Sequence, residues 1–292
     1  MLEFMAPAKL NLTLEVLARR ENGFHEIRSV AQTINLCDTI RFRPGEGVEF
    51  SCSDTDWAAS ESLLARTVNL LREAIGCSRG VLIEVEKRIP LLSGLSGDSS
   101  DAAAALCGLN RLWELGLSQE ELLGLAARLG SDVTFFLYGG TALLEGRGEA
   151  VTSLPPFPHN WVVLVLPPVP RMPGKTARLY SGIRAGHYSD GSITDRLTAC
   201  LNRGGGMPYS LLFNVFDEVA PVSFPGLESY RQQFLEAGAP EVHLAGSGPV
   251  LFSLVRDRAG AEEICQHLSE LGLNHYLTDT MTAFEGTGAE LL

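Results

Sequence analysis

Apolar and polar side chains alternate in the first part of the chain, which is the pattern of β-strands. Residues 8–17 follow this alternation, and residues 30–42 and 81–86 are rich in β-branched side chains. Because successive side chains of a strand point to opposite faces, alternation places one apolar face against a core. We therefore predict strands in these three stretches and a first half that begins with β-structure.

Apolar residues at helical spacing mark three further segments of the same half. They recur at intervals of three and four residues over 61–76, 99–113 and 118–129. Gly76 is suited to end the first of these helices, and Ser118 is suited to cap the start of the third. Strands and helices together predict an α+β unit.

A proline-rich run, 153–158, separates this half from a strongly apolar strand at 161–166. Prolines interrupt regular structure, so this run is the best candidate for a domain boundary. Beyond it, predicted helices and strands alternate, near 226–237, 241–245, 250–255 and 259–271. The pattern predicts two α+β layer domains, residues 1–155 and 156–292.

The composition is that of a globular protein, and the net charge argues against one class of partner. The chain has 292 residues, of which 45% are hydrophobic and 20% charged, so it is long enough for two cores. The formal net charge is −12 and the Lys and Arg residues are scattered, so a nucleic-acid backbone would be repelled. We expect no nucleic-acid partner.

The six cysteines lie far apart and form neither a CxxC pair nor a Cys/His cluster. This distribution favours reduced thiols over structural zinc. No stretch approaches the length of a membrane-spanning segment, and the N-terminus has no recognisable secretion leader. We expect a cytoplasmic protein with no membrane partner, and the sequence does not indicate its oligomeric state.

The segment 90–105 has the composition of an anion-binding turn. A strand ends there, two glycines and three serines follow, and a helix begins. Gly94 and Gly97 allow backbone N–H groups to approach a ligand, and the helix start adds a partial positive charge. A serine-capped helix after a flexible loop would have a similar composition, so this segment alone leaves both interpretations open.

Two better-known nucleotide-binding signatures are absent from the sequence. The tripeptide GKT at 174–176 would end a P-loop, but Val169 stands where a P-loop needs its first glycine. The tripeptide GSG at 246–248 is followed by Leu251 where a dinucleotide fingerprint needs its third glycine. A phosphate site in this chain must belong to another class.

Three motifs, in order along the chain, resemble those of the GHMP kinases, the superfamily of galactokinase, homoserine kinase and mevalonate kinase. Residues 6–12 read APAKLNL, residues 90–105 read PLLSGLSGDSSDAAAA, and residues 246–249 read GSGP. The resemblance implies ATP as phosphoryl donor and a two-domain α+β fold. The N-terminal domain would be ribosomal-S5-like and the C-terminal domain ferredoxin-like, with ATP and acceptor meeting in the cleft between them.

Longer stretches resemble one branch of this superfamily, the kinases of the non-mevalonate (MEP) route to isoprenoids. These stretches are 19–40, 130–149 and 211–220. The resemblance implies phosphorylation of the 2-hydroxyl of a cytidine diphosphate-linked methylerythritol, with ATP and Mg²⁺. Two alternatives stay open: another acceptor, such as homoserine, mevalonate or a sugar, and a non-catalytic binding protein with the kinase fold.

Lys9 and Asp132 match the pair that this family places at the acceptor hydroxyl. Asp132 would accept the hydroxyl proton, and Lys9 would stabilise the developing alkoxide and keep the carboxylate ionised. Without the resemblance, Lys9 would be interpreted as a solvated surface charge and Asp132 as a turn residue. The likeness to the family motifs favours the catalytic interpretation of both.

The resemblance also assigns residues to the two substrates. ATP would be bound by Pro90, Gly94, Leu95, Ser96, Gly97, Asp98, Ser99 and Ser100, with Ser99 as the candidate Mg²⁺ ligand. The acceptor would be bound by Asn11, Phe24, His25, Thr176, Tyr180, Gly246, Ser247 and Gly248. Phe24, His25 and Tyr180 would stack on the cytosine and hydrogen-bond its edge. On residue type alone, His25 would equally be a turn histidine without a ligand, and Phe24 and Tyr180 would equally be packed core residues.

Two positions depart from the family pattern. Asp98 lies in the phosphate turn where relatives commonly carry glycine, and a carboxylate there would repel a triphosphate. Asp98 would instead cap the following helix or bind Mg²⁺, and capping is the role that we expect. Val215 replaces an aspartate that is frequent in the family, a change that we interpret as tolerated.

Overall fold

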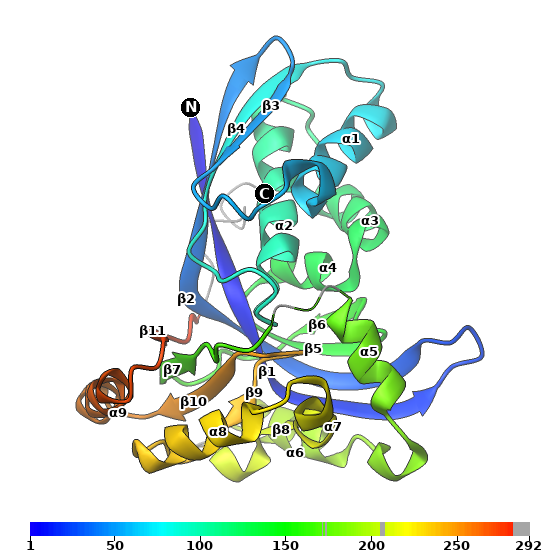
Figure 1. Cartoon of the computed structure of the whole chain (residues 1–292). Coiled ribbons are helices and arrows are strands. Elements are labelled where there is room, and N and C mark those ends of the chain that lie inside the picture. The colour runs from blue at the N-terminus through cyan, green and yellow to red at the C-terminus, as the bar shows by residue number, and fades with distance from the viewer. Residues whose placement is uncertain (171, 173, 205–207, 283–292) are drawn as a thin grey trace.

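Two β-sheets form the framework of the protein (Figure 1). The computed structural model describes residues 1–170, 172, 174–204 and 208–282. The first sheet contains β1 (Leu2–Arg19), β2 (His25–Gly45), β3 (Val48–Cys52), β4 (Gly80–Glu86), β5 (Thr141–Gly146), β6 (Ala150–Ser153) and β8 (Phe213–Asn214). The second sheet contains β7 (Trp161–Val165), β9 (His243–Leu244), β10 (Leu251–Val255) and β11 (His275–Asp279).

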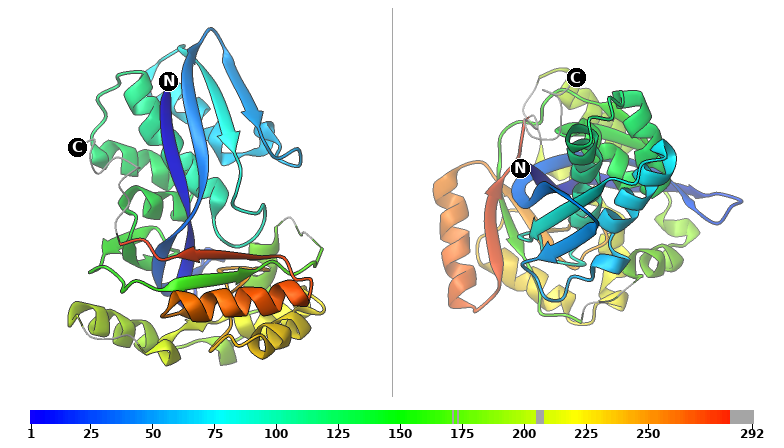
Figure 2. Two further views of the ribbon diagram at one scale, coloured as in Figure 1. Left: turned by 90° about the vertical axis from the view of Figure 1, so that its left-hand side faces the viewer. Right: turned by 90° about the horizontal axis from the view of Figure 1, so that it is seen from above.

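Helices cover the two sheets. The first half contains α1 (Leu63–Ile75), α2 (Gly97–Leu112), α3 (Gln119–Leu129) and α4 (Ser131–Tyr138), which gather beside the long strands β1 and β2 (Figures 1 and 2). The second half contains α5 (Lys175–Gly182), α6 (Ser192–Asn202), α7 (Phe216–Ser223), α8 (Leu227–Glu236) and α9 (Arg258–Glu270). Among the helices of the described residues, none combines the length and the apolarity needed to cross a membrane.

The strands β1 and β2 pair antiparallel over most of their length and form the centre of the first sheet, whose main order is β3-β4-β2-β1-β8. The pairing register shifts between Pro7 and Ala8, where a proline has no N–H to donate to the ladder. Lys9 and Asn11 follow this shift and lie two residues apart, so they share one face of the strand. The strand therefore presents both polar side chains together.

Helix α2 is buried against the first sheet and is rich in small residues. The four alanines at 102–105 are fully buried. A side chain at Gly108 would overlap the ring of Phe42, which is itself fully buried. This close packing fixes the start of α2, and with it the glycine-rich turn that precedes it.

A shared core joins the two sheets. It combines Ala8, Leu10 and Val30 from the first sheet with Leu164 and Phe252 from the second, all fully or almost fully buried. On the opposite side of the second sheet, α7, α8 and α9 cover a further apolar cluster. The two halves of the chain are therefore held together by apolar packing.

Most of the predicted elements are present, and the α+β class is confirmed. The predicted helices correspond to α1, α2, α3, α8 and α9, and the predicted strands lie in β1, β2, β4, β7, β9 and β10. Helix α4 was not predicted, because its sequence SDVTFFLY is apolar on nearly all sides and has no helical period. Asp132 consequently lies in the first turn of a helix, whereas the sequence placed it in a turn.

The predicted division at residues 155 and 156 falls between β6 and β7, in the link between the two sheets. Later parts of the chain nevertheless return to the first sheet. Strand β8 pairs parallel to β1 at Thr13 and Leu14, and Thr280 forms a bridge with Ile34 of β2. The exact division of the chain into domains stays a prediction.

Candidate active site

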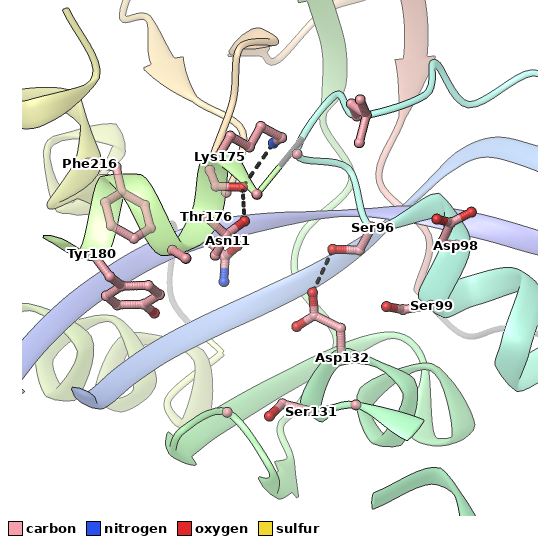
Figure 3. A pocket seen from close by; sticks show the side chains of 18 of the residues that line it. Asn11, Ser96, Asp98, Ser99, Ser131, Asp132, Lys175, Thr176, Tyr180 and Phe216 are labelled. Carbon is pink, nitrogen blue, oxygen red and sulfur yellow. Dashed lines mark hydrogen bonds between the residues drawn. The ribbon is translucent and has the colours of Figure 1, made fainter. Parts of the chain in front are cut away.

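A cleft of about 1750 Å³ lies where the glycine-rich turn, α4, α5 and the turn before β10 meet (Figure 3). Most of the predicted site residues line it, although the sequence distributes them over both halves of the chain. They are Lys9, Asn11, Phe24, His25, Pro90, Gly94, Ser96, Gly97, Asp98, Ser99, Asp132, Thr176, Tyr180, Gly246 and Ser247. Folding therefore brings both sets of predicted substrate contacts to one cavity.

Lys9 and Asp132 face each other in this cleft. The Lys9 ammonium nitrogen Nζ lies 3.4 Å from Asp132 Oδ1, and the side chains are 5% and 34% exposed respectively. Lys9 Nζ also donates a hydrogen bond of 2.9 Å to Asn11 Oδ1, and Asn11 Nδ2 in turn donates to Ser29 Oγ. The buried cation is thus oriented by an amide and balanced by a carboxylate that solvent, or a substrate, can reach.

Asp132 is held on its other side by the glycine-rich turn. Ser96 Oγ donates a hydrogen bond of 2.6 Å to Asp132 Oδ2 (Figure 3). Helix α4 begins one residue earlier, so the carboxylate also lies at the positive end of a helix. A carboxylate fixed by two neighbours at the wall of a cleft is well placed to take a proton from a bound hydroxyl.

The glycine-rich turn leads into α2, as expected for an anion site, but the capping role of Asp98 is wrong. Helix α2 starts at Gly97, Ser96 occupies the N-cap position with a φ of 60°, and no side chain caps the helix start. Asp98 is the second helical residue, and its exposed carboxylate lines the cleft. With the left-handed conformation at Ser96, the helix starts two residues earlier than the Asp-Ser-Ser-Asp pattern suggests.

Three predicted residues do not line the cleft. Leu95 belongs to the shared core, and its carbonyl accepts a hydrogen bond from the Lys9 backbone N–H. Ser100 is fully buried inside α2, and Gly248 accepts a hydrogen bond from Lys175 through its carbonyl. Each of the three supports the walls of the site, and their predicted ligand contacts stay predictions.

A buried charge cluster lies beneath the glycine-rich turn. Lys87 Nζ lies 2.5 Å from Asp38 Oδ2 and 2.9 Å from Asp101 Oδ2, and all three side chains are at most 2% exposed. Asp38 Oδ1 also accepts the backbone N–H groups of Arg88 and Ile89, directly before the turn. This cluster ties β2, the end of β4 and α2 together at the base of the predicted phosphate site.

Aromatic side chains line the far end of the cleft. The His25 and Tyr180 rings stack with centroids 4.9 Å apart, and Phe216 packs edge-on against Tyr180. Phe24 is 54% exposed and lies under the Arg147 guanidinium. Burial, and secondarily the charge of Arg19, lowers the pKa of His25, so this ring is neutral near pH 7. A base would have to displace one ring to enter between His25 and Tyr180.

Lys175 is a site residue that sequence reasoning missed. The tripeptide GKT drew attention only as a failed P-loop, yet Lys175 lines the cleft and is 7% exposed. Its Nζ donates to Ser247 Oγ at 2.9 Å and to the Gly248 carbonyl, and Thr176 Oγ1 lies 2.8 Å from the same Ser247 hydroxyl. Only the fold shows that this lysine is buried.

Comparison with known proteins agrees with this site. Residues 62–140 match the GHMP kinases N terminal domain and residues 198–274 match the GHMP kinases C terminal domain. Together with the Lys9–Asp132 pair beside a glycine-rich turn, these two domain matches define the chain as a two-domain kinase of the GHMP class. A relative from Dehalococcoides mccartyi, 4-diphosphocytidyl-2-C-methyl-D-erythritol kinase, is 49% identical over 281 residues, which cover 96% of this chain and 99% of the relative. The chain belongs to this family of kinases.

Other relatives and solved structures agree with this placement. A 4-diphosphocytidyl-2-C-methyl-D-erythritol kinase from Symbiobacterium thermophilum is 39% identical over 285 residues and covers 96% of this chain and 100% of the relative. A crystal structure of 4-(cytidine 5'-diphospho)-2C-methyl-D-erythritol kinase superposes with a TM-score of 0.81 at 32% identity, covering 96% and 99% of the two chains. The homoserine kinase of Cytophaga hutchinsonii, at 19% identity and a TM-score of 0.68, shares the fold.

Proposed function

We propose that this kinase transfers the γ-phosphoryl group of ATP to the 2-hydroxyl of 4-diphosphocytidyl-2-C-methyl-D-erythritol. The observation that carries the proposal is the 3.4 Å contact between Lys9 and Asp132, with Ser96 of the glycine-rich turn bonded to the same carboxylate. A proton acceptor, a buried cation and a phosphate-binding turn then meet at one point. Phosphoryl transfer needs these three parts and little else from a protein.

In the proposed reaction, Asp132 accepts the proton of the acceptor hydroxyl. The freed oxygen forms a bond to the γ-phosphorus while the bond from this phosphorus to the bridging oxygen breaks, and ADP leaves. Lys9, within 3.4 Å of Asp132, stabilises the negative charge that develops on the attacking oxygen. The Asn11 amide keeps the Lys9 ammonium directed at this point.

We place ATP at the glycine-rich turn and Mg²⁺ beside it. The wall there offers hard oxygen donors, the hydroxyls of Ser96 and Ser99 and the carboxylates of Asp98 and Asp132, all of which line the cleft. Such a set suits a Mg²⁺ ion that keeps most of its ligands as water and phosphate oxygens. The ion would neutralise phosphate charge, and Ser99 is the candidate protein ligand.

The aromatic end of the cleft supports a cytidine-bearing acceptor. Homoserine, mevalonate and galactose carry no base that could stack, whereas Tyr180, His25 and Phe24 all line this cleft. Tyr180 lies on the side of the cleft away from the glycine-rich turn (Figure 3). Stacking on such rings is worth about 1–3 kcal/mol per base. The proposed acceptor would place its base there and its methylerythritol hydroxyl at Asp132.

The proposed setting is the cytoplasm, with small molecules as the only substrates. None of the six cysteines, all of which lie in the described part of the chain, forms a disulfide. Reduced thiols are typical of that compartment. The net charge of −12 opposes binding to a nucleic acid.

A coupled assay of ATP consumption against a panel of acceptors tests the proposed function. We expect turnover with the cytidylyl substrate, loss of useful turnover when the cytidylyl group is removed, and loss of activity when Mg²⁺ is chelated. NMR of the product should place the new phosphate on the 2-hydroxyl. Faster turnover of homoserine, mevalonate or galactose would contradict the proposed acceptor and support only the assignment to the GHMP class. No turnover with any acceptor would favour a binding protein.

A further inference from the structure

Lys175 lies at the middle of the cleft, between its two functional ends. Tyr180, five residues further along α5 (Figure 3), stacks on His25 at the aromatic end. On the other side, Lys175 bonds to Ser247, whose neighbour Gly246 lies against Asn11 beside the Lys9–Asp132 pair. Lys175 therefore lines the same cleft as Tyr180 and Asp132, beside Thr176 and Asn11.

The charge of Lys175 has no balancing carboxylate. Its two protein partners, the Ser247 hydroxyl and the Gly248 carbonyl, are both neutral, and within the described part of the chain no acidic side chain forms an ion pair with it. An ammonium has three donors, of which partners among the described residues take two. A buried cation without a counter-charge is costly, and an anionic ligand at the same place removes this cost.

The arginines that line the cleft lie closer to solvent than Lys175, and Arg19 is exposed. Arg147 lies over Phe24 and 3.6 Å from Glu149 Oε1, and Arg184 donates to the carbonyls of Ser181 and Ile183. Burial lowers the pKa of Lys175 to about 7, so the free protein avoids part of the cost of a buried charge. An adjacent anion favours the protonated form again.

We propose that Lys175 binds the diphosphate of the acceptor, as the buried cation between the base-binding rings and the Lys9–Asp132 pair. This inference rests on the proposed function, since it takes the acceptor to be a nucleoside diphosphate derivative. Ser247 and Thr176, whose hydroxyls lie 2.8 Å apart, complete the diphosphate site with neutral donors. The site discriminates a diphosphate-linked acceptor from an uncharged one.

Calorimetric titration with cytidine diphosphate and with cytidine separates the diphosphate contact from base stacking. A saturating non-hydrolysable ATP analogue is present throughout, so that the probes cannot occupy the ATP side. For Lys175→Met, we expect the affinity for cytidine diphosphate to fall at least about tenfold, the scale of a lost charge-assisted hydrogen bond, while cytidine binding is unchanged. Lys175→Gln, which keeps donors for Ser247 and Gly248 but has no charge, should behave like the Met variant.

Arg178→Met is the matched control, because Arg178 is an exposed cation on the same helix and does not line the cleft. It should bind both probes as the unchanged protein does, and thermal melting verifies that each variant is folded. Equal affinity of the Lys175 variants and the unchanged protein for cytidine diphosphate would overturn the inference and leave the proposed function standing. A loss of affinity for the ATP analogue alone, with the affinity for cytidine diphosphate unchanged, would also overturn the inference. Failure of the unchanged protein to bind cytidine diphosphate would overturn both.

Discussion

Three buried lysines line the cleft, and they differ in how far their charges are balanced. Lys87 lies between two carboxylates; burial alone would lower its pKa, but Asp101 and Asp38 raise it above the ordinary value. Lys9 faces one carboxylate, Asp132. Lys175 faces none among the described residues, and its pKa is lowered. This series suggests a structural, a catalytic and a ligand-binding cation respectively, because an unbalanced buried charge is stable only with a ligand.

Replacement of Asp132 by Asn tests the residue at the centre of the proposed reaction. Asn is similar in size and can still bond to Ser96, but it cannot accept the proton of the acceptor hydroxyl. We expect kcat to fall at least about 10²-fold, the usual scale of a lost general base, with little change in ATP affinity. Steady-state kinetics and titration with an ATP analogue measure both quantities. A kcat near that of the unchanged enzyme would mean that the acceptor is merely positioned.

At the scale of elements, the predicted ATP site depends on how α2 docks on the first sheet. Small residues allow close approach, since a side chain at Gly108 would overlap Phe42. The Lys87 cluster then joins the start of α2 to β2 and to the end of β4. The glycine-rich turn connects these elements, so its shape follows from the packing and charge pairing beneath it.

Lys87→Met should destabilise this junction strongly. Removal of the cation leaves Asp38 and Asp101 buried without their partner, and breaking a buried pair in this way typically costs about 3–5 kcal/mol of unfolding free energy. Urea unfolding followed by circular dichroism measures the change. Arg88→Met is the matched control, because Arg88 is 60% exposed and its contact with Glu86 is worth at most about 1 kcal/mol. Equal effects of the two substitutions would contradict the structural role of Lys87.

At the scale of the whole molecule, the active site is formed where the two halves of the chain touch. The glycine-rich turn of the first half packs against the turn at 245–248 of the second half, at Gly94. Strand β8 and the bridge between Ile34 and Thr280 add further links between the halves. Close backbone packing at Gly94 therefore contributes to the spacing of the two turns at the active site.

Gly94→Ala should separate the two turns. The added Cβ atom would lie 2.6 Å from the backbone nitrogen of Gly248 and would also overlap the carbonyl oxygen of Ala245. One of the two turns would therefore have to move. Because a misplacement of about 1 Å can reduce turnover about 10²-fold, we expect a fall of that order in kcat/KM. Gly116→Ala is the control, since Gly116 has a similarly positive φ of +67° but open space around it. If both variants kept full activity in steady-state assays, the contact at Gly94 would have no functional role.

The sequence by itself determined the features that depend on neighbouring residues. Alternation along 8–17 and helical spacing along 61–76 predict elements, because the faces of a strand or helix are set within one segment. The turn before α2 was recognisable for the same reason, since its glycines and serines are contiguous. The resemblance of such local motifs to the GHMP kinases also identified Lys9 and Asp132 as a candidate pair.

Only the tertiary structure decided which groups meet and how their charges are balanced. The two-residue strand β8 forms because β1 offers it a partner, and nothing in its own sequence predicts it. Asp98 is not the cap of α2, because the backbone at Ser96 starts the helix earlier than the local pattern suggests. Lys175 became a candidate only when folding buried it against Ser247, with no carboxylate of the described residues paired to it. The burial of a side chain and the charges around it depend on residues that are far apart in the sequence. For that reason, neither can be predicted from a single stretch of the sequence.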